Sequence, residues 1–222
     1  MRPEKKRTGI SGDLLSILSE TWKHRHIPFL FEKQTDGIVI TGYKDNLLPK
    51  VEIPSEIQGV PVKKIGARAF LQCDFIEEVI LTDGIETIEA NAFSSCDRLT
   101  KIRMADSVHI IGRNAFFECE NLFDVELSSL LVEIDNRAFF GCVGLRDIAL
   151  PDSLKRIGDQ AFSGCRKLKS IRMPLALEFL PRNVFDGCSQ LDSIYLEKGS
   201  YADTILSQSD YFIKKLRYIP RI

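Results

Sequence analysis

Long apolar runs are missing from this 222-residue sequence. The longest run near the start, Leu14 to Leu18, is interrupted by Ser16 and is shorter than the roughly 7–15 apolar residues of a secretory signal. No segment approaches the roughly 20 apolar residues that a membrane helix needs. We therefore expect no membrane span and a cytoplasmic location, with an extracellular or cell-surface location as the alternative if the full gene carries a targeting segment.

An excess of either charge is also missing. The chain has 30 basic and 31 acidic side chains, which gives a formal net charge of −1. Nucleic acids and anionic membranes are attracted by strongly basic surfaces, so either partner requires a local patch here. Catalytic signatures are absent as well, because the sequence contains no G-x-S-x-G, H-E-x-x-H, P-loop or G-x-G-x-x-G pattern. We expect no cofactor and no catalysis, and we keep an enzyme as a remote alternative.

What the sequence does contain is a repeat of 23 residues. The six cysteines recur at this period: Cys73, Cys96, Cys119, Cys142, Cys165 and Cys188. A row of phenylalanines has the same period: Phe70, Phe93, Phe116, Phe139, Phe162 and Phe185. So does a row of aliphatic residues: Ile65, Ile88, Ile111, Ile134, Ile157 and Leu180. Six copies without an insertion indicate a repeat protein.

Each copy combines two local periods. The pattern Ala-Phe-x-x-Cys places apolar residues at i, i+1 and i+4, which is one face of a helical or 3₁₀ turn, whereas Ile102-x-Met104 has the alternation of a strand. One copy cannot bury its apolar face alone, so the copies must stack into a solenoid with like residues in ladders. Polar groups are then spread along the stack: Glu86, His109 and Lys155 occupy equivalent positions of different copies, which does not favour a catalytic cluster.

The full pattern is I-x-x-x-A-F-x-x-C-x-x-L-x-x-I-x-L-P, seen in IDNRAFFGCVGLRDIALP at 134–151. It resembles the BspA-like leucine-rich repeat family, also described as the Treponema pallidum type. ITGYKDN at 40–46 and VEIPSEIQGVPVKKIG at 51–66 resemble that family's entry hairpin and first turn, and KGSYADTILSQSDYF at 198–212 resembles its closing segment.

The resemblance implies an α/β-repeat fold: a right-handed leucine-rich-repeat solenoid, capped at both ends, with a concave parallel β-sheet and short helical or 3₁₀ turns on the convex side. It also implies a binding role without catalysis. Most members are secreted or surface-exposed bacterial or protist proteins, whereas this sequence shows no signal peptide.

The N-terminal part is expected to close one end of the stack. Residues 1–27 are predicted to hold a tail and an amphipathic helix that begins after Ser11 or Asp13 and packs on the first layers. Partner docking or membrane binding by this helix is the alternative. Residues 28–61 are predicted to form a capping hairpin, with Asp36-Gly37 at its turn, and an entry segment.

Residues 62–199 hold the six repeats, and residues 200–222 are expected to form a C-terminal cap. We predict a short helix from Ser200 to Leu206 and an extended strand over 211–222. This strand carries basic and aromatic side chains together: Lys214, Lys215, Arg217, Arg221, Tyr211, Phe212 and Tyr218. Such a mixture occurs in single-strand nucleic-acid sites, but protection of a sheet edge explains it more simply. We expect no nucleic-acid partner.

Six cysteines raise three alternatives, which are disulfides, a metal site or packing. A disulfide needs Cα atoms within about 4.4–6.8 Å, whereas packed helical elements lie about 8–10 Å apart. Zinc needs about four converging ligands, while the pattern supplies one thiol per layer, and His24, His26 and His109 share no row with the cysteines. We therefore expect buried thiols that pack as small apolar residues.

The predicted strands carry two outward rows that vary between copies. If Ile102 and Met104 face the core, Lys101 and Arg103 face outward. The first row is Glu78, Lys101, Asp124, Asp147, Ser170 and Ser193. The second is Ile80, Arg103, Glu126, Ala149, Arg172 and Tyr195. We predict a partner site on the concave face formed by Ile80, Lys101, Arg103, Asp124, Glu126, Arg172 and Tyr195.

Within this face we favour Ile80, Arg103, Arg172 and Tyr195, because Arg and Tyr are typical interface anchors. The alternative is that Lys101 with Asp124, and Arg103 with Glu126, only neutralise one another. We expect a protein-protein interaction module with an unidentified protein partner. A secreted or cell-surface adhesin that binds a matrix protein or a glycan is the alternative.

Overall fold

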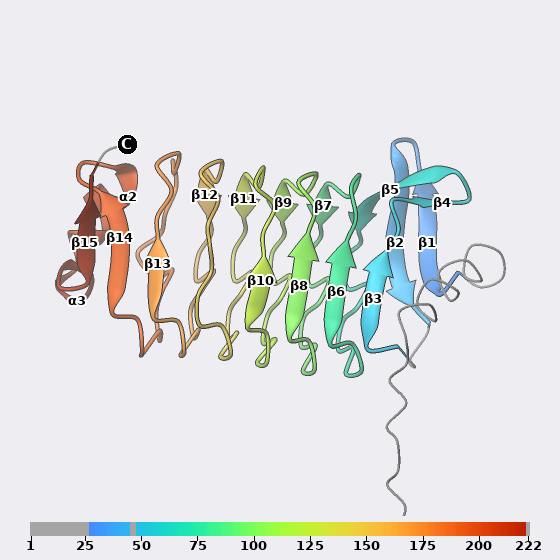
Figure 1. The fold of residues 1–222 in the computed structure, drawn as a ribbon, viewed down its shortest axis with the longest axis horizontal. Coiled ribbons are helices and arrows are strands. Elements are labelled where there is room, and N and C mark those ends of the chain that lie inside the picture. The colour runs from blue at the N-terminus through green and yellow to red at the C-terminus, as the bar shows by residue number, and fades with distance from the viewer. Residues whose placement is uncertain (1–26, 45–47, 221–222) are drawn as a thin grey trace, which may run out of the picture.

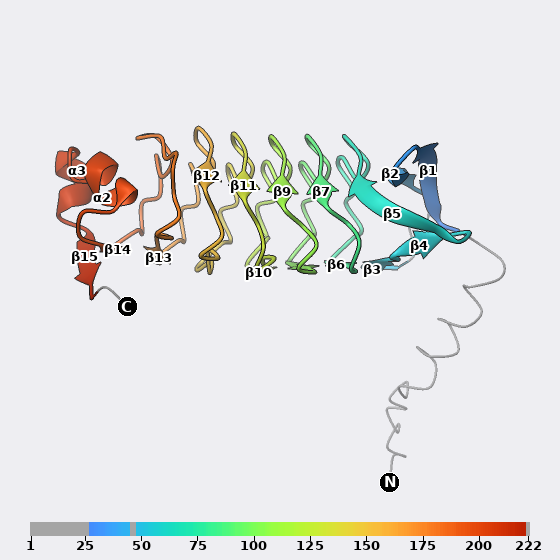
Figure 2. The same ribbon diagram turned by 90° about the horizontal axis from the view of Figure 1, so that it is seen from above.

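The computed structural model describes residues 27–44 and 48–220. The predicted helix after Ser11 or Asp13 lies outside the described residues. The described chain forms a solenoid whose layers lie side by side in sequence order, from a hairpin at one end to two short helices at the other (Figure 1 and Figure 2). This parallel-strand solenoid confirms the fold class that the repeat predicted.

The first sheet is the predicted parallel sheet. Four of its strands follow the order β10-β8-β6-β3: β3 (Lys50–Ile53), β6 (Glu78–Leu81), β8 (Lys101–Met104) and β10 (Asp124–Glu126). Three more continue along the same side of the solenoid: β13 (Ser170–Arg172), β14 (Ser193–Glu197) and β15 (Leu216–Ile219). Between them, residues 146–150 form no strand. We call this side of the molecule the first sheet.

A second sheet, which the sequence did not indicate, runs along the other side of the layers (Figure 2). It contains β1 (Phe29–Gln34), β2 (Gly37–Tyr43), β5 (Val60–Ile65), β7 (Thr87–Ile88), β9 (Ile110–Ile111), β11 (Glu133–Ile134) and β12 (Arg156–Ile157), and β4 (Glu56–Ile57) pairs with β5. Five of these strands, β4 included, have two residues each, which is too short for alternation to be visible in the sequence.

The Ala-Phe-x-x-Cys segments form successive tight turns. In the second copy the N–H of Ala92 donates to the carbonyl of Glu89, and the N–H of Ser94 donates to the carbonyl of Asn91, both at 3.2 Å. These i to i+3 bonds close β-turns rather than the predicted helical or 3₁₀ turns, since Asn91 within the first of them has a left-handed backbone. Asn91 (φ 58°) and Ser95 (φ 55°) have left-handed backbones, which stops the turn from continuing as a helix.

The phenylalanine row is the core of the solenoid, as predicted. All six rings are at most 1% exposed. Neighbouring rings stack with centroids 4.8–6.0 Å apart. The aliphatic residues of both sheets complete this core, so each layer buries the apolar side of the next.

The N-terminal hairpin is confirmed, with its turn one residue earlier than predicted. Gln34 pairs with Gly37, so Thr35 and Asp36 connect the strands. Gly37 has φ +146°, and a Cβ there would lie 2.6 Å from the carbonyl oxygen of Pro61, so only glycine fits. β2 pairs in parallel with β5, which joins the hairpin to the second sheet.

The C-terminal cap is only partly as predicted. Helix α2 (Tyr201–Leu206) is confirmed, and the Ser200 side chain caps it by accepting from the N–H of Asp203. The prediction of an extended strand over 211–222 was wrong at its start. Helix α3 (Asp210–Ile213) forms a helical turn there, and β15 begins only at Leu216. This turn brings Phe212 edge-on to Phe185, at 6.2 Å, where it covers the last ring of the phenylalanine stack.

Candidate functional site

The candidate site is the outward face of the first sheet. The strand register places Lys50, Glu78, Lys101 and Asp124 in one outward row, and Glu52, Ile80, Arg103 and Glu126 in the next. Between these rows, Val79 and Ile102 point inward and are 0% exposed. Inward and outward side chains therefore alternate along these strands as predicted.

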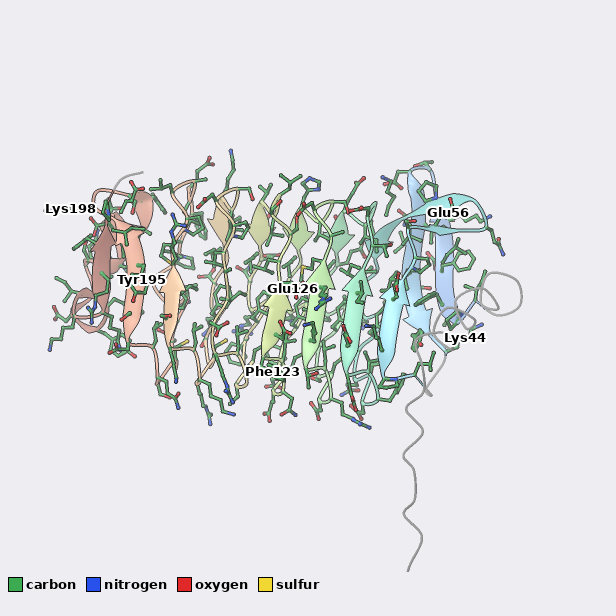
Figure 3. All side chains as sticks on the ribbon, in the orientation of Figure 1. Lys44, Glu56, Phe123, Glu126, Tyr195 and Lys198 are labelled. Carbon is green, nitrogen blue, oxygen red and sulfur yellow. The ribbon has the colours of Figure 1, made fainter. Side chains whose placement is uncertain are left out.

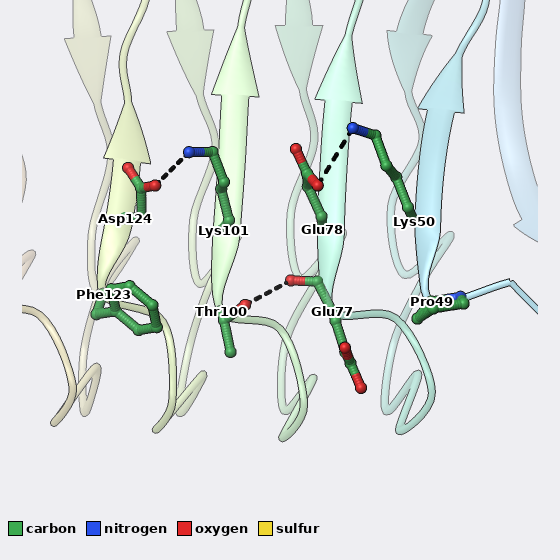
Figure 4. A pocket seen from close by; sticks show the side chains of 8 residues that line it. All are labelled: Pro49, Lys50, Glu77, Glu78, Thr100, Lys101, Phe123 and Asp124. Atoms are coloured by element: carbon green, nitrogen blue, oxygen red, sulfur yellow. Dashed lines mark hydrogen bonds and ion pairs between the residues drawn. The ribbon is translucent and has the colours of Figure 1, made fainter. Parts of the chain in front are cut away.

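In the N-terminal half of this face the charged side chains pair with each other. Arg103 lies 3.1 Å from Glu126, and Lys101 contacts Asp124 and lies 3.7 Å from Glu126. Lys50 and Glu78 form a further pair at 3.3 Å (Figure 4). Side chains in these pairs are 22–54% exposed, so each pair contributes only about 0–1 kcal/mol to stability. Neutralisation, the alternative considered for these residues, is thus part of their role.

A shallow groove of about 330 Å³ lies over the start of the same strands (Figure 4). It is lined by Pro49, Lys50, Glu77, Glu78, Thr100, Lys101, Phe123 and Asp124. Phe123 is 52% exposed, in contrast to the buried phenylalanines of the repeat row. The sequence did not single out Phe123, because it stands just before the strand, in a row that contains Thr100 and Arg146 in neighbouring copies.

The C-terminal half of the face has a different character. Arg172 pairs in register with Tyr195, and Tyr195 pairs with Arg217 of β15. All three side chains are exposed, and Tyr195 stands on the open face in Figure 3. Arg217 was missed as a member of this row because it follows Tyr195 after 22 residues rather than 23.

The four favoured residues do not form one cluster. Ile80 pairs with Arg103, and Arg172 pairs with Tyr195. Arg103 and Arg172 are three layers apart, which is about 14 Å at about 4.8 Å per layer. The four residues therefore lie on one face as two separate pairs, and only the members of each pair are neighbours.

Five of the six cysteines are buried, as predicted, whereas Cys73 in the first copy is partly exposed; all six thiols are free. Each buried thiol donates a hydrogen bond to the carbonyl of the phenylalanine 26 residues earlier, with distances of 3.0–3.2 Å. Burial raises the pKa of Cys142 and Cys165 well above its usual value, and that of Cys73 to about 12. The helix-spacing argument against disulfides was wrong in its premise, because backbone hydrogen bonds join successive turns directly, as from the N–H of Phe93 to the carbonyl of Ala115 at 2.8 Å.

Among residues 27–44 and 48–220, no three His, Cys, Asp or Glu side chains are placed to hold a metal ion. None of the helices in these ranges has the length and apolar character needed to cross a bilayer.

At the C-terminal cap, Lys215 lies over the Tyr211 ring at 4.6 Å and donates to the carbonyl of Leu191, so both residues are used within the fold.

Comparison with known proteins finds one family. The model of the BspA type leucine rich repeat region matches six copies, over residues 41–136 and 118–218. Among solved structures, a T. pallidum leucine-rich repeat protein is 32% identical with a TM-score of 0.73, over 75% of this chain and 78% of that one. Repeats of this kind indicate a protein-interaction module.

Two further structures are longer proteins. A leucine-rich repeat protein of Bacteroides ovatus is 30% identical with a TM-score of 0.68, over 78% of this chain and 46% of that one. A leucine rich cell surface protein of Faecalibacterium prausnitzii is 25% identical with a TM-score of 0.61, over 78% of this chain and 54% of that one. This chain spans about half the length of these two proteins. The search of curated proteins finds no match.

Proposed function

Because this chain belongs to the BspA-type leucine-rich repeat family, we propose that it is a non-catalytic protein-interaction module that binds its partner on the outward face of the first sheet. The family supports the general role. The choice of this face rests on its exposed side chains.

The observation that carries the proposal is the row Arg172, Tyr195 and Arg217. These residues lie in register on three hydrogen-bonded strands. Within the part of the chain that the structure describes, neither arginine forms an ion pair, and the Tyr195 side chain is 39% exposed. Arg and Tyr are the residues most often found as energetic anchors of interfaces. Arg217 donates to the carbonyls of Lys214 and Leu216, at 3.0 and 3.1 Å, so Arg172 is the guanidinium of this row that is more available to a partner's carboxylate.

The N-terminal half of the face is expected to lie at the rim of the interface rather than at its energetic centre. Lys101, Arg103, Asp124 and Glu126 already satisfy one another, so a partner gains little by replacing those contacts. Such residues act at the rim, where they affect the association rate and its salt dependence. We therefore place the energetic centre at Arg172 and Tyr195.

The test is affinity capture with purified variants of verified fold. The variant Arg172→Glu/Tyr195→Ala removes both anchors, and the control Arg113→Glu/Phe179→Ala makes the same charge reversal and a similar aromatic-to-alanine change elsewhere. Arg113 and Phe179 are exposed and lie on the side of the second sheet. A protein retained by wild type and control but lost by the first variant supports the proposal. Equal retention by all three contradicts it.

A cell-surface adhesin is a second candidate, and the F. prausnitzii protein favours it because that protein is described as a cell surface protein. The same three proteins can be applied to extracellular matrix proteins and to a glycan array. Retention that depends on Arg172 and Tyr195 with a matrix protein or a glycan supports this candidate over an intracellular partner.

A further inference from the structure

Charge is divided along one edge of the solenoid. We call this edge the turn edge: it contains the residues that lead into the strands of the first sheet, at the bottom of Figure 1. One row of the turn edge reads Asp74, Asp97, Glu120, Val143, Arg166 and Ser189. The row beside it reads Glu77, Thr100, Phe123, Arg146, Lys169 and Asp192. Acidic residues thus lie in the Phe123 layer and in the two layers before it, with Arg98 among them, and basic residues follow for two layers.

Three basic side chains of this edge form no ion pair, although Asp147 follows Arg146 and Asp192 is the next residue in the row of Lys169. Arg146, Arg166 and Lys169 are exposed, and none of them forms an ion pair within residues 27–44 and 48–220. On the acidic side, Asp74 is also exposed without an ion pair in these ranges, and the Glu77 carboxylate pairs with Arg98. The edge therefore carries acidic and basic side chains in separate layers. Glu77 already pairs with Arg98, whereas Asp74, Arg166 and Lys169 pair with no opposite charge within the described chain.

Phe123 marks the boundary between the two charges. Its side chain is 52% exposed, as much as that of any apolar residue in the described chain. Figure 3 and Figure 4 place it at the lower end of β10, beside the groove. An exposed aromatic ring flanked by opposite charges is the arrangement expected at the centre of a self-complementary contact.

A twofold axis through the Phe123 layer pairs the opposite charges. Lys169 follows Phe123 by two layers, and Glu77 precedes it by two layers. Arg166 and Asp74 have the same relation within the neighbouring row. Two layers span about 10 Å at about 4.8 Å per layer. If a second copy runs in the opposite direction, Lys169 faces Glu77 of the second copy and Arg166 faces Asp74 of the second copy, twice in the same contact.

We propose that two copies of this chain associate antiparallel through the turn edge, with Phe123 of both copies at the twofold axis. This interface goes beyond the proposed partner site, which lies on the sheet face. The contact extends over four layer steps, about 19 Å, and is two residue rows wide, so it is smaller than a standard protein interface. A stable interface buries about 800 Å² per partner, so the dimer is weak, reversible and sensitive to salt.

The first test is sedimentation velocity over increasing protein concentration, at low and high salt. We expect wild type to form a dimer that weakens as salt rises. Arg166→Glu/Lys169→Glu makes the edge acidic, and Asp74→Lys/Glu77→Lys makes it basic. Each variant alone should lose at least about tenfold in dimer affinity through like-charge repulsion, whereas a mixture of the two should form a heterodimer at least as tight as the wild-type dimer.

The control Lys44→Glu/Lys198→Glu has the same change of net charge as the acidic variant. Lys44 and Lys198 are exposed and lie at opposite ends of the solenoid (Figure 3). This control should dimerise as wild type does. Wild type that stays monomeric at all concentrations overturns the proposal, and so does a dimer that both edge variants retain, because that dimer uses another surface. A wild-type monomer that binds poly-glutamate through Arg166 and Lys169 also overturns it, in favour of an acidic partner.

The second test places a cysteine at the axis. Phe123→Cys should form an intermolecular disulfide under a mild oxidant, because the two copies of this position face each other. Leu130→Cys is the matched control, since Leu130 is also 52% exposed. Faster cross-linking at 123 supports the twofold contact, and equal rates contradict it. Neither test depends on the sheet-face partner, so either proposal can fail alone.

Discussion

Replacement of Phe139 by alanine tests the core ladder directly. The ring is 0% exposed and lies between two other rings, with centroids 5.1 Å from Phe116 and 5.4 Å from Phe162. Removal of a buried phenylalanine costs about 3–5 kcal/mol, and two stacked neighbours place the loss at the upper end of that range, since each aromatic pair adds about 0.5–1.5 kcal/mol. For a chain of this size, about 2–4 °C per kcal/mol corresponds to a fall in Tm of about 10 °C or more.

The assay is urea unfolding followed by circular dichroism, together with a thermal scan. The control is Phe123→Ala, measured at low protein concentration, which removes the same atoms from an exposed site and should change the free energy of unfolding by less than about 0.5 kcal/mol. A loss below about 1 kcal/mol for Phe139→Ala, or equal losses for both variants, would refute the ladder as the source of stability.

Three further predictions follow from single contacts. A double-mutant cycle of Arg103→Ala and Glu126→Ala should give a coupling below about 1 kcal/mol by urea unfolding, because the pair is exposed; a larger value contradicts this. Phe212→Ala should speed amide hydrogen exchange in the last layers only, because its ring covers the end of the stack; uniform acceleration argues against a cap. Burial raises the pKa of Cys142 and Cys165 above the value of 9.0, so the folded chain keeps protons that the unfolded chain loses. Stability should therefore be constant with respect to these thiols below pH 9 and fall above it, by about 1 kcal/mol per pH unit for each thiol; Cys142→Ala should reduce the slope, and an unchanged slope contradicts this.

The repeat was visible in the sequence because each layer has the same buried surroundings. Phe139 and Cys142 occupy positions that only one shape of side chain fills, so the same residue types return every 23 positions. The outward rows were also predictable, since the strand alternation at Ile102 and Met104 fixes which neighbours point outward.

Other features depend on contacts that spacing does not show. Asn91 and Ser95 adopt left-handed backbones, but equivalent positions hold Arg137 and Gly141, so no common residue type marks the turn. The second sheet consists mainly of two-residue strands, which leave too little periodicity. Arg217 joins the sheet face because β15 pairs with β14, a cap contact that the repeat period does not contain.

The central claim is that a protein partner binds the first sheet at Tyr195. The most direct measurement is site-specific photo-cross-linking in cells of the source organism, with a photoreactive phenylalanine in place of Tyr195 or, as the control, in place of Phe179. These side chains are 39% and 37% exposed and lie on opposite sides of the solenoid. The account predicts a discrete cross-linked protein from position 195 that is absent from position 179. The same cross-links from both positions, or a discrete product from position 179 alone, would contradict it.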